Sequence, residues 1–262
     1  MELSVKDQRE TLNTVLMDGD VVSALWSFVD SGLANDILPE LPALRLEQDP
    51  IHRHKEVLSH TIAVTSKTSP DLVLRLAALF HDIGKPATRR IHNGGVTFRH
   101  HEVVGAKITR KRLRRLEYSE EIVRDVSELV RLSGRFKGYA EGWGDSAVRR
   151  YARDAGHLLG KLNDLVRSDC TSRHERVHVE LHHHVDDLER RITELAEEDR
   201  KSAERPLLDG EEIMQRFSVG PGPSIGRALE FLLELKRNHP DLDRTETEEK
   251  LDVWWRSQNP SS

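Results

Sequence analysis

An adjacent histidine and aspartate, His81-Asp82, follow the most apolar stretch of the chain. Residues 72–80 contain almost no polar side chains, which predicts a helix that is buried on nearly all sides. An unpaired carboxylate at the end of such a helix costs several kcal/mol to desolvate, so Asp82 needs a base, hydrogen bonds or a metal ion beside it. We expect Gly84 to end this helix in a left-handed turn and Pro86 to prevent its continuation.

Two further side chains that can bind metal are expected on the inner faces of other helices. His60 and Asp169 each lie three and four residues from apolar positions of a predicted helix. Together with His81 and Asp82 they form a mixed nitrogen and oxygen set suited to a divalent ion such as Mn, Mg, Ni, Co, Fe or Zn. The alternative is a hydrogen-bonded His-Asp pair in the core, because a buried histidine usually has a structural role.

Cations follow the His-Asp pair at short range. Lys85 and Arg89 are expected at the mouth of the site, where they would hold phosphate and stabilise charge on the phosphoryl oxygens. A solvated loop is the alternative interpretation. Upstream, His52 and His54 stand in polar surroundings and are expected to form hydrogen bonds or contact phosphate. The cations beside the possible metal ligands predict a site that holds phosphate.

A second group of cations is expected on the helix that begins near Val103. In this helix Ile108, Leu113 and Leu116 point inward. The basic residues that point largely outward are Lys107, Arg110, Lys111, Arg114 and Arg115. Such a face can bind the phosphates of a nucleic-acid backbone. A charged face that is only solvated is an equally good interpretation.

A glycine-rich loop farther along the chain mixes cations with aromatic rings. Arg135 and Lys137 alternate with Phe136 and Tyr139, and Trp143 follows. Cations beside aromatic rings can bind the phosphates and stack on the bases of RNA. Packing of the loop against the rest of the protein explains the same rings.

The composition is that of a soluble globular protein. Of its 262 residues 37% are hydrophobic, and the longest apolar run is too short to span a bilayer. The N-terminus carries no apolar signal region, so a cytoplasmic location is expected. The net charge of −5 excludes no class of partner, because the charges are unevenly distributed. The single Cys170 cannot form an internal disulfide.

The periodicity of apolar residues predicts an all-α fold. It consists of a helical bundle, a long coiled-coil-like helix at residues 175–200 and a small C-terminal helical unit. A short hairpin is expected at residues 91–98, around an Asn-Gly turn. The expected divisions are an N-terminal segment 1–50, the bundle 51–172, a helical arm 173–204 and a C-terminal tail 205–262.

The series His60, His81-Asp82 and Asp169 resembles the ligand pattern of the HD superfamily of metal-dependent phosphohydrolases. Longer segments resemble the C-terminal half of bacterial CCA-adding tRNA nucleotidyltransferases, especially the actinobacterial type. These segments are HDIGKPATRR, FRHHEVVGAKITRKR, DSAVRRY, DCTSR, and DGEEIM with PGPSIGRAL. The resemblance covers nearly the whole chain. It implies that the four residues of the series are metal ligands, and that His101 is a further ligand or a catalytic histidine.

The nucleotidyltransferase head of that family, with its paired aspartates, has no counterpart in this sequence. We therefore expect the chain alone not to add nucleotides to tRNA. The resemblance implies a phosphatase or 2′,3′-cyclic phosphodiesterase that acts on nucleotides or RNA 3′ ends, with tRNA as a candidate partner and no membrane contact. The alternative is the tRNA-binding, non-catalytic half of a split or truncated enzyme, which works with a separate nucleotidyltransferase chain.

The sequence also departs from the family pattern at two positions. The family favours histidines where this chain has Ser133 and Lys137. Serine is a poor ligand for a divalent metal and a protonated lysine cannot bind one. A second metal position is therefore expected to be weak or absent.

Overall fold

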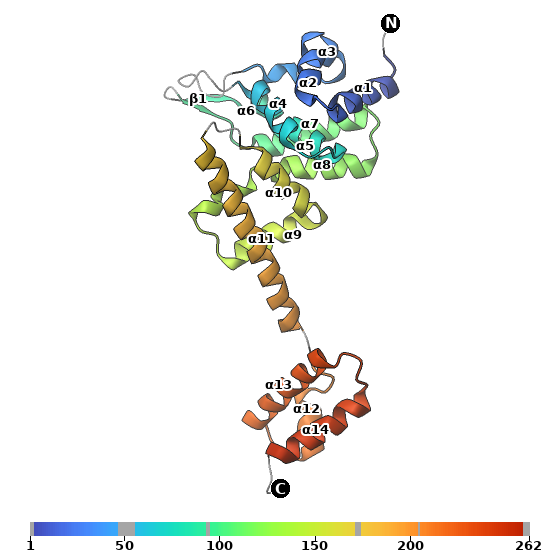
Figure 1. Ribbon diagram of the computed structural model, residues 1–262, viewed down its shortest axis with the longest axis vertical. Coiled ribbons are helices and arrows are strands. Elements are labelled where there is room, and N and C mark those ends of the chain that lie inside the picture. Colours follow the sequence, from blue (N-terminus) through green and yellow to red (C-terminus); the bar gives the residue numbers. More distant parts are fainter. Residues whose placement is uncertain (1–2, 47–55, 93–94, 171–173, 204, 259–262) are drawn as a thin grey trace. The chain divides into compact units, whose positions relative to one another are not determined.

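The computed structural model describes residues 3–46, 56–92, 95–170, 174–203 and 205–258. The described chain is helical apart from one small two-stranded sheet, which confirms the expected all-α fold (Figure 1). It divides into two compact units, residues 1–192 and 193–262. The expected domain boundaries at 50/51, 172/173 and 204/205 involve residues outside the described ranges and stay predictions. None of the described helices has both the length and the hydropathy that crossing a membrane requires.

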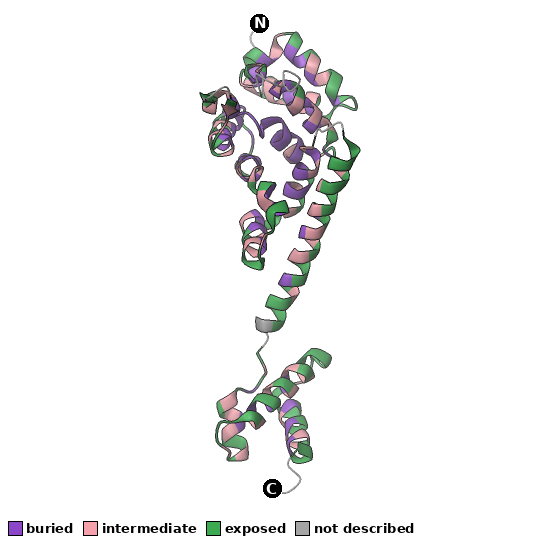
Figure 2. Ribbon diagram, turned by 90° about the vertical axis from the view of Figure 1, so that its left-hand side faces the viewer, coloured by how far each residue is buried: buried purple, intermediate pink, exposed green. Residues whose placement is uncertain are grey.

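Helix α5, Leu72–Phe80, lies at the centre of the first unit. Asp71 caps its N-terminus, because the carboxylate accepts a hydrogen bond of 2.8 Å from the Leu74 amide. Every residue from Leu74 to Phe80 is buried, and each large apolar side chain among them contributes about 1.5–3 kcal/mol through burial. The predicted buried helix is therefore confirmed, and Figure 2 shows buried residues concentrated in the interior helices.

Other helices surround α5. It packs against α1 (Val5–Met17), α4 (Val57–Lys67), α7 (His101–Arg115), α8 (Glu120–Leu132) and α10 (Leu159–Ser168). The only charged residue of α5, Arg75, is buried as well, and its guanidinium donates a hydrogen bond to the carbonyl oxygen of Leu16. A cation is favourable there because the last carbonyls of a helix carry partial negative charge. Arg75 thus fastens the end of α1 to α5.

Short elements complete the first unit. They are α2 (Val21–Asp30), α3 (Leu33–Ile37), η1 (Pro42–Leu44), α6 (Lys85–Thr88), η2 (Arg135–Glu141), α9 (Asp145–Ala155) and η3 (Gly156–Leu158). Strands β1 (Arg90–His92) and β2 (Gly95–Thr97) pair in antiparallel fashion, with Ile91 opposite Val96. This pairing confirms the predicted hairpin, while its Asn-Gly turn at 93–94 lies outside the described residues.

The predicted role of Gly84 is wrong. Its φ is −82°, in the right-handed region, so no left-handed turn ends α5. The chain instead leads through this residue into α6, and Pro86 stands in the first turn of that helix. A Cβ atom on Gly84 would lie 2.2 Å from the carbonyl oxygen of His101 and 2.6 Å from the amide nitrogen of Gly105. Glycine is required because the backbone of α7 passes directly against the turn that carries His81 and Asp82.

Helix α11, Glu175–Ala203, contains the predicted apolar seam. Val185 and Leu188 are fully buried and Leu195 is 6% exposed. Leu181 and Ile192 are half-buried. Most other positions of this helix are exposed, so the seam is one narrow stripe on a charged helix (Figure 2).

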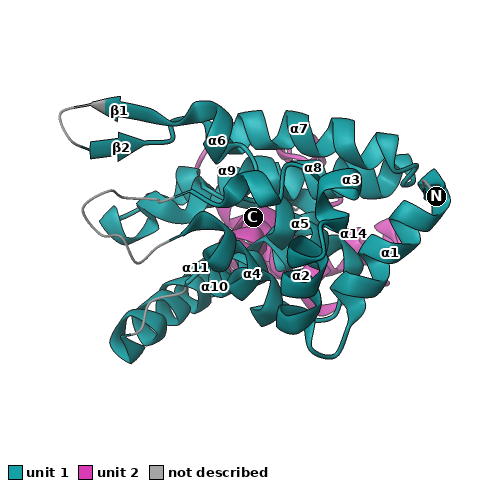
Figure 3. Cartoon of the chain, turned by 90° about the horizontal axis from the view of Figure 1, so that it is seen from above, with its two compact units in different colours: residues 1–192 teal, residues 193–262 magenta. Residues whose placement is uncertain are grey.

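The second unit, magenta in Figure 3, contains α12 (Gly210–Phe217), α13 (Pro223–Asn238) and α14 (Arg244–Gln258), which Figure 1 labels. Its buried core consists of Leu208, Ile213, Ile225, Ala228, Leu232, Leu251 and Trp255. The Trp255 ring stacks on Phe217 with centroids 4.2 Å apart. Helix α14 was not predicted, although Thr247, Leu251 and Trp255 recur every four residues and are all buried.

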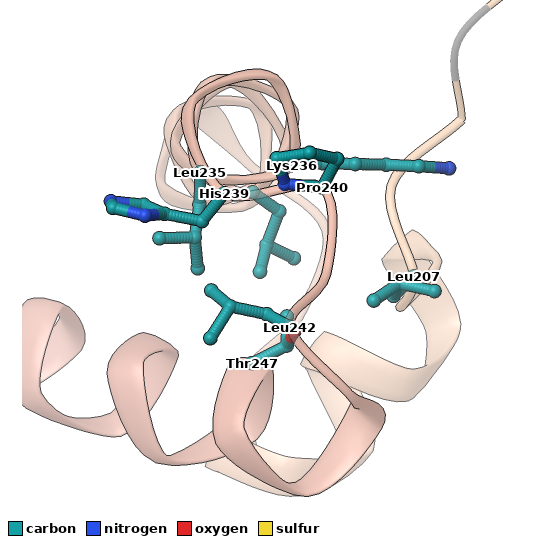
Figure 4. A pocket seen from close by; sticks show the side chains of 8 residues that line it. Leu207, Leu235, Lys236, His239, Pro240, Leu242 and Thr247 are labelled. Atoms are coloured by element: carbon teal, nitrogen blue, oxygen red, sulfur yellow. The ribbon is translucent and has the colours of Figure 1, made fainter.

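A small cavity lies where α13, the segment after it and α14 meet (Figure 4). Leu207, Leu235 and Leu242 line it, with Lys236 and His239 at its edge. Its volume of about 60 Å³ is far below the several hundred Å³ of a typical ligand site. We interpret it as a gap in packing.

Gly84→Ala is expected to destabilise the protein by about 1–3 kcal/mol or more, because the added methyl meets two backbone atoms that cannot rotate away. The control is Gly160→Ala in α10, where a Cβ meets nothing within 4 Å, and which should stabilise by about 0.5–1 kcal/mol. Urea unfolding of the three proteins measures both effects. Equal stability of Gly84→Ala and the wild type would contradict the close approach of α7.

Candidate metal centre

Four side chains that are far apart in sequence meet at one place in the first unit. His60 comes from α4, His81 and Asp82 from the turn after α5, and Asp169 from the end of α10. The Nε2 atom of His60 lies 2.9 Å from Asp169 Oδ1 and 3.7 Å from Asp82 Oδ2. The Nε2 atom of His81 lies 3.3 Å from His60 Nε2, 3.3 Å from Asp82 Oδ2 and 3.5 Å from Asp169 Oδ1.

These separations fit the coordination shell of a divalent metal. With bonds of about 2.1 Å, ligand atoms at a right angle lie ~3.0 Å apart, and ligand atoms in a tetrahedron lie ~3.4 Å apart. The five separations above, from 2.9 to 3.7 Å, bracket both values. His60, His81 and Asp82 each offer one ligand atom within 4.8 Å of the others. Asp169 approaches both imidazoles from the end of α10.

Backbone carbonyls fix the orientation of two imidazoles. The Nδ1 atom of His81 lies 2.7 Å from the carbonyl oxygen of Ala78. A carbonyl only accepts, so Nδ1 carries a hydrogen. When the ring gives up its other proton, the lone pair is on Nε2, which faces the other ligands. His101 repeats this arrangement, since its Nδ1 lies 2.8 Å from the carbonyl oxygen of Phe98 and its Nε2 lies 3.4 Å from Asp82 Oδ1. Such outer hydrogen bonds are typical of metal-binding histidines.

The charges of the four residues are strongly coupled. Burial alone would raise the pKa of Asp82 and lower that of His81, because it disfavours both charged forms. Their mutual attraction outweighs burial. The pKa of Asp82 lies well below its usual range, chiefly through His81, and the pKa of His81 is raised to about 10 by Asp82 and Asp169. The pKa of Asp169 is likewise lowered, against the effect of burial, by hydrogen bonds from the two histidines.

Comparison with known proteins agrees with this geometry. Residues 56–250 match the HD domain family. The chain belongs to that family. It is 30% identical over 236 residues to the A-adding tRNA nucleotidyltransferase of Deinococcus radiodurans, an alignment that covers 87% of this chain and 53% of that protein. It is 33% identical over 240 residues to the CC-adding tRNA nucleotidyltransferase of Thermus thermophilus, covering 86% and 51%. The chain thus spans about half the length of these curated relatives.

The two cations predicted at the mouth of the HD site differ in their surroundings. Lys85 is buried and not at an open mouth, because its Nζ lies 2.6 Å from Asp82 Oδ2. Arg89 follows one helical turn later and is half-buried. Its Nε is buried and has no hydrogen-bond partner among the described residues. The Arg89 Nε atom is therefore without a partner among the described residues, whereas the Lys85 ammonium is already paired.

The basic residues predicted on α7 are all exposed: Lys107, Arg110, Lys111, Arg114 and Arg115. The first four line a shallow open hollow on the helix surface. Arg114 forms a two-pronged ion pair with Glu120 at 2.8 and 2.9 Å. For the other four no ion pair within 4.0 Å is found among the described residues, although Arg110 also attracts the Glu120 carboxylate. The buried Arg112 of the same helix binds Glu40 at 2.7 Å and serves packing.

The glycine-rich loop at η2 is packed instead of open. Phe136 and Tyr139 are buried and stack on each other with centroids 5.4 Å apart. The packing interpretation of these rings therefore holds. Arg135 pairs with Asp154 at 2.5 Å, and Lys137 lies 3.4 Å from Glu102.

At Ser133 and Lys137 the resemblance led us to expect histidines. Ser133 Oγ donates a hydrogen bond of 2.9 Å to the Val130 carbonyl oxygen. The Lys137 ammonium lies beside Glu102. The weak second metal position therefore stays a prediction.

The groups that orient the HD ligands were not predicted from the sequence. Ala78 and Phe98 act through their carbonyl oxygens, so no side-chain type signals their role. The Glu102 side chain packs directly against Gly134: a Cβ atom on Gly134 would lie 2.2 Å from the Oε1 atom of Glu102. Each histidine that is held in this way stands three residues after the carbonyl it binds, and this spacing is the only signal in the sequence.

Metal binding is expected to tighten with rising pH. In the metal-free protein His81 stays protonated up to a pKa of about 10, whereas a metal ligand must be deprotonated, so binding near neutral pH expels one proton. The lowered pKa values of Asp82 and Asp169 mean that neither carboxylate adds a proton. The apparent affinity for Mn²⁺ should rise by about tenfold per pH unit between pH 6 and 8. Titration calorimetry in buffers of different ionisation enthalpy measures the proton release, and a pH-independent affinity would contradict it.

Proposed function

We propose that this protein is a metal-dependent phosphohydrolase that acts on phosphate esters of nucleotides or RNA 3′ ends, with tRNA as the related RNA. One observation carries the proposal. His60, His81 and Asp82 each offer a ligand atom within 4.8 Å of the others, and Asp169 Oδ1 lies 2.9 and 3.5 Å from the two imidazoles. Backbone carbonyls bind Nδ1 of His81 and of His101, which leaves Nε2 of each ring for the centre. A divalent ion bound there supplies Lewis acidity to the phosphoryl group and acidifies water.

The residues around the ligands have distinct expected roles. His101 can exchange a proton at Nε2, because its Nδ1 is fixed by the Phe98 carbonyl. Arg89, whose buried Nε lacks a partner among the described residues, can bind a phosphoryl oxygen. Lys85 can approach the same group once it leaves Asp82. These residues would stabilise the charge that develops on phosphate during hydrolysis.

The link to RNA rests on two independent facts. Both relatives named above carry tRNA in their names. The exposed face of α7 carries five cations, of which only Arg114 and Arg110 interact with a described carboxylate, that of Glu120. Exposed cations in a row favour contact with a phosphate backbone. We propose that this face, with Arg135 and Lys137 as predicted additional contacts, binds RNA.

A second function is favoured by the same basic face. The chain covers about half of each tRNA nucleotidyltransferase that it resembles. A protein of this kind can hold tRNA through α7 while a separate nucleotidyltransferase chain performs the chemistry. Hydrolytic activity of the purified chain separates the two functions, because the binding role requires none.

The hydrolase proposal is tested with 2′,3′-cyclic, 2′- and 3′-phosphate nucleotides and with RNA that ends in these groups. After chelation and reloading with Mn²⁺, Ni²⁺, Co²⁺ or Mg²⁺, the wild type should release phosphate or open the cyclic ester. Asp82→Asn and Asp169→Asn should lose bound metal and at least about 100-fold of activity. Asp164→Asn, an exposed aspartate on the same helix as Asp169, is the control and should keep both. Activity in Asp82→Asn equal to the wild type would refute the site.

The RNA proposal is tested by replacing Lys107, Arg110, Lys111, Arg114 and Arg115 together with Gln. Binding of labelled tRNA should weaken, and the dependence of log affinity on log salt should flatten by about 0.7–0.9 for each phosphate that the variant no longer neutralises. The control replaces Lys6 and Arg124, two exposed cations of α1 and α8 that already have acidic neighbours. An unchanged salt slope in the α7 variant would show that this face is only solvated.

A further inference from the structure

Lys85 has surroundings that are unusual for a lysine. It is the first residue of α6 and is 6% exposed, although lysine is among the residues least often buried. Its Nζ lies 2.6 Å from Asp82 Oδ2 and 5.6 Å from the centre of the Phe98 ring. Among the described residues Asp82 is the only carboxylate within ion-pair distance of this ammonium. Lys85 and Asp82 therefore form a buried ion pair in the turn between α5 and α6.

The oxygen that Lys85 binds is the one that a metal ion needs. Asp82 Oδ2 lies 3.3 Å from His81 Nε2 and 3.7 Å from His60 Nε2. The other oxygen, Oδ1, faces His101. An ion held by the imidazoles of His60 and His81 would therefore share Oδ2 with the ammonium. Two cations on one buried oxygen repel each other strongly, because little solvent is present to screen them.

We propose that Lys85 is an internal cation that competes with the metal ion for Asp82 and keeps metal affinity low until a phosphate group gives the ammonium another partner. This inference rests on the proposed function. Phosphate draws the ammonium away from Oδ2 and so favours metal binding, and by thermodynamic linkage the metal favours phosphate by the same factor. The Lys85 side chain would then couple the binding of the metal ion to the binding of phosphate.

The test measures Mn²⁺ affinity by calorimetry and by the spectroscopic signal of free Mn²⁺, with and without inorganic phosphate. Lys85→Gln removes the charge but keeps a donor for Asp82, and Lys85→Met removes both. In the absence of phosphate each should bind Mn²⁺ about tenfold tighter than the wild type or more. Phosphate should then improve Mn²⁺ affinity less in these variants than in the wild type. Circular dichroism identifies which of the two variants is folded, and either one decides the outcome.

Two controls isolate the charge. Lys85→Arg keeps the cation, so its phosphate-free affinity should stay near that of the wild type. Lys161→Met removes a lysine that pairs with Asp71, outside the ligand set, and should leave Mn²⁺ affinity unchanged. If the folded neutral variants bind Mn²⁺ as weakly as the wild type or more weakly, Lys85 orients Asp82 instead of competing for it, and the inference is overturned.

Failure of the proposed function looks different. If the wild type and both neutral variants bind no Mn²⁺ with or without phosphate, the four residues are not a metal site and the phosphohydrolase proposal fails with them. If all bind Mn²⁺ with one affinity, the metal site stands and only the competition by Lys85 is refuted.

Discussion

The negative charge of Asp82 is the constraint on which the structure of the first unit depends. Its side chain is only 3% exposed at the end of an apolar helix, where an uncompensated carboxylate would cost several kcal/mol. Four basic side chains surround the carboxylate: His60, His81 and Lys85 lie near Oδ2, and His101 lies near Oδ1. The elements that supply these groups, α4, α6 and the start of α7, must therefore meet at the end of α5. The helices of the first unit thus pack around the Asp82 carboxylate as well as around the apolar core.

Much of this arrangement could be predicted from local sequence. The apolar run of α5 and the chemistry of the His-Asp pair are visible in the residue types, and helical spacing places His60 and Asp169 on inner faces. The approach of α7 to Gly84 could not be predicted, because glycine at a helix end suggests a turn just as strongly as a close contact. The burial of Lys85 was also missed, since its partner is set by tertiary packing. The local sequence pattern predicts which face of a helix a residue occupies. The residue that it contacts on another helix depends on the tertiary fold.

The basic residues in the sequence were ambiguous as well. Whether such a residue is free to bind RNA depends on whether a carboxylate pairs with it, which only the structure shows. The cations of α7 and those of the η2 loop look alike as residue types. In the structure Arg135 is bound to Asp154, whereas Lys107 and Lys111 have no ion pair with a described residue. The aromatic residues of the loop are occupied too, because Phe136 and Tyr139 stack on each other. Of these two groups of cations, the one on α7 is therefore the more available to a phosphate backbone.

The four proposed ligands are not equally accessible to solvent. The side chains of Asp82 and His81 are 3% and 4% exposed and that of His60 is 16% exposed, while that of Asp169 is 38% exposed. The Gly84 contact with α7 closes the turn behind His81 against any bulky group. Among the four described ligands, Asp169 therefore forms the solvent-facing side of the centre and Asp82 its buried side, so water and ions reach the centre most readily beside Asp169.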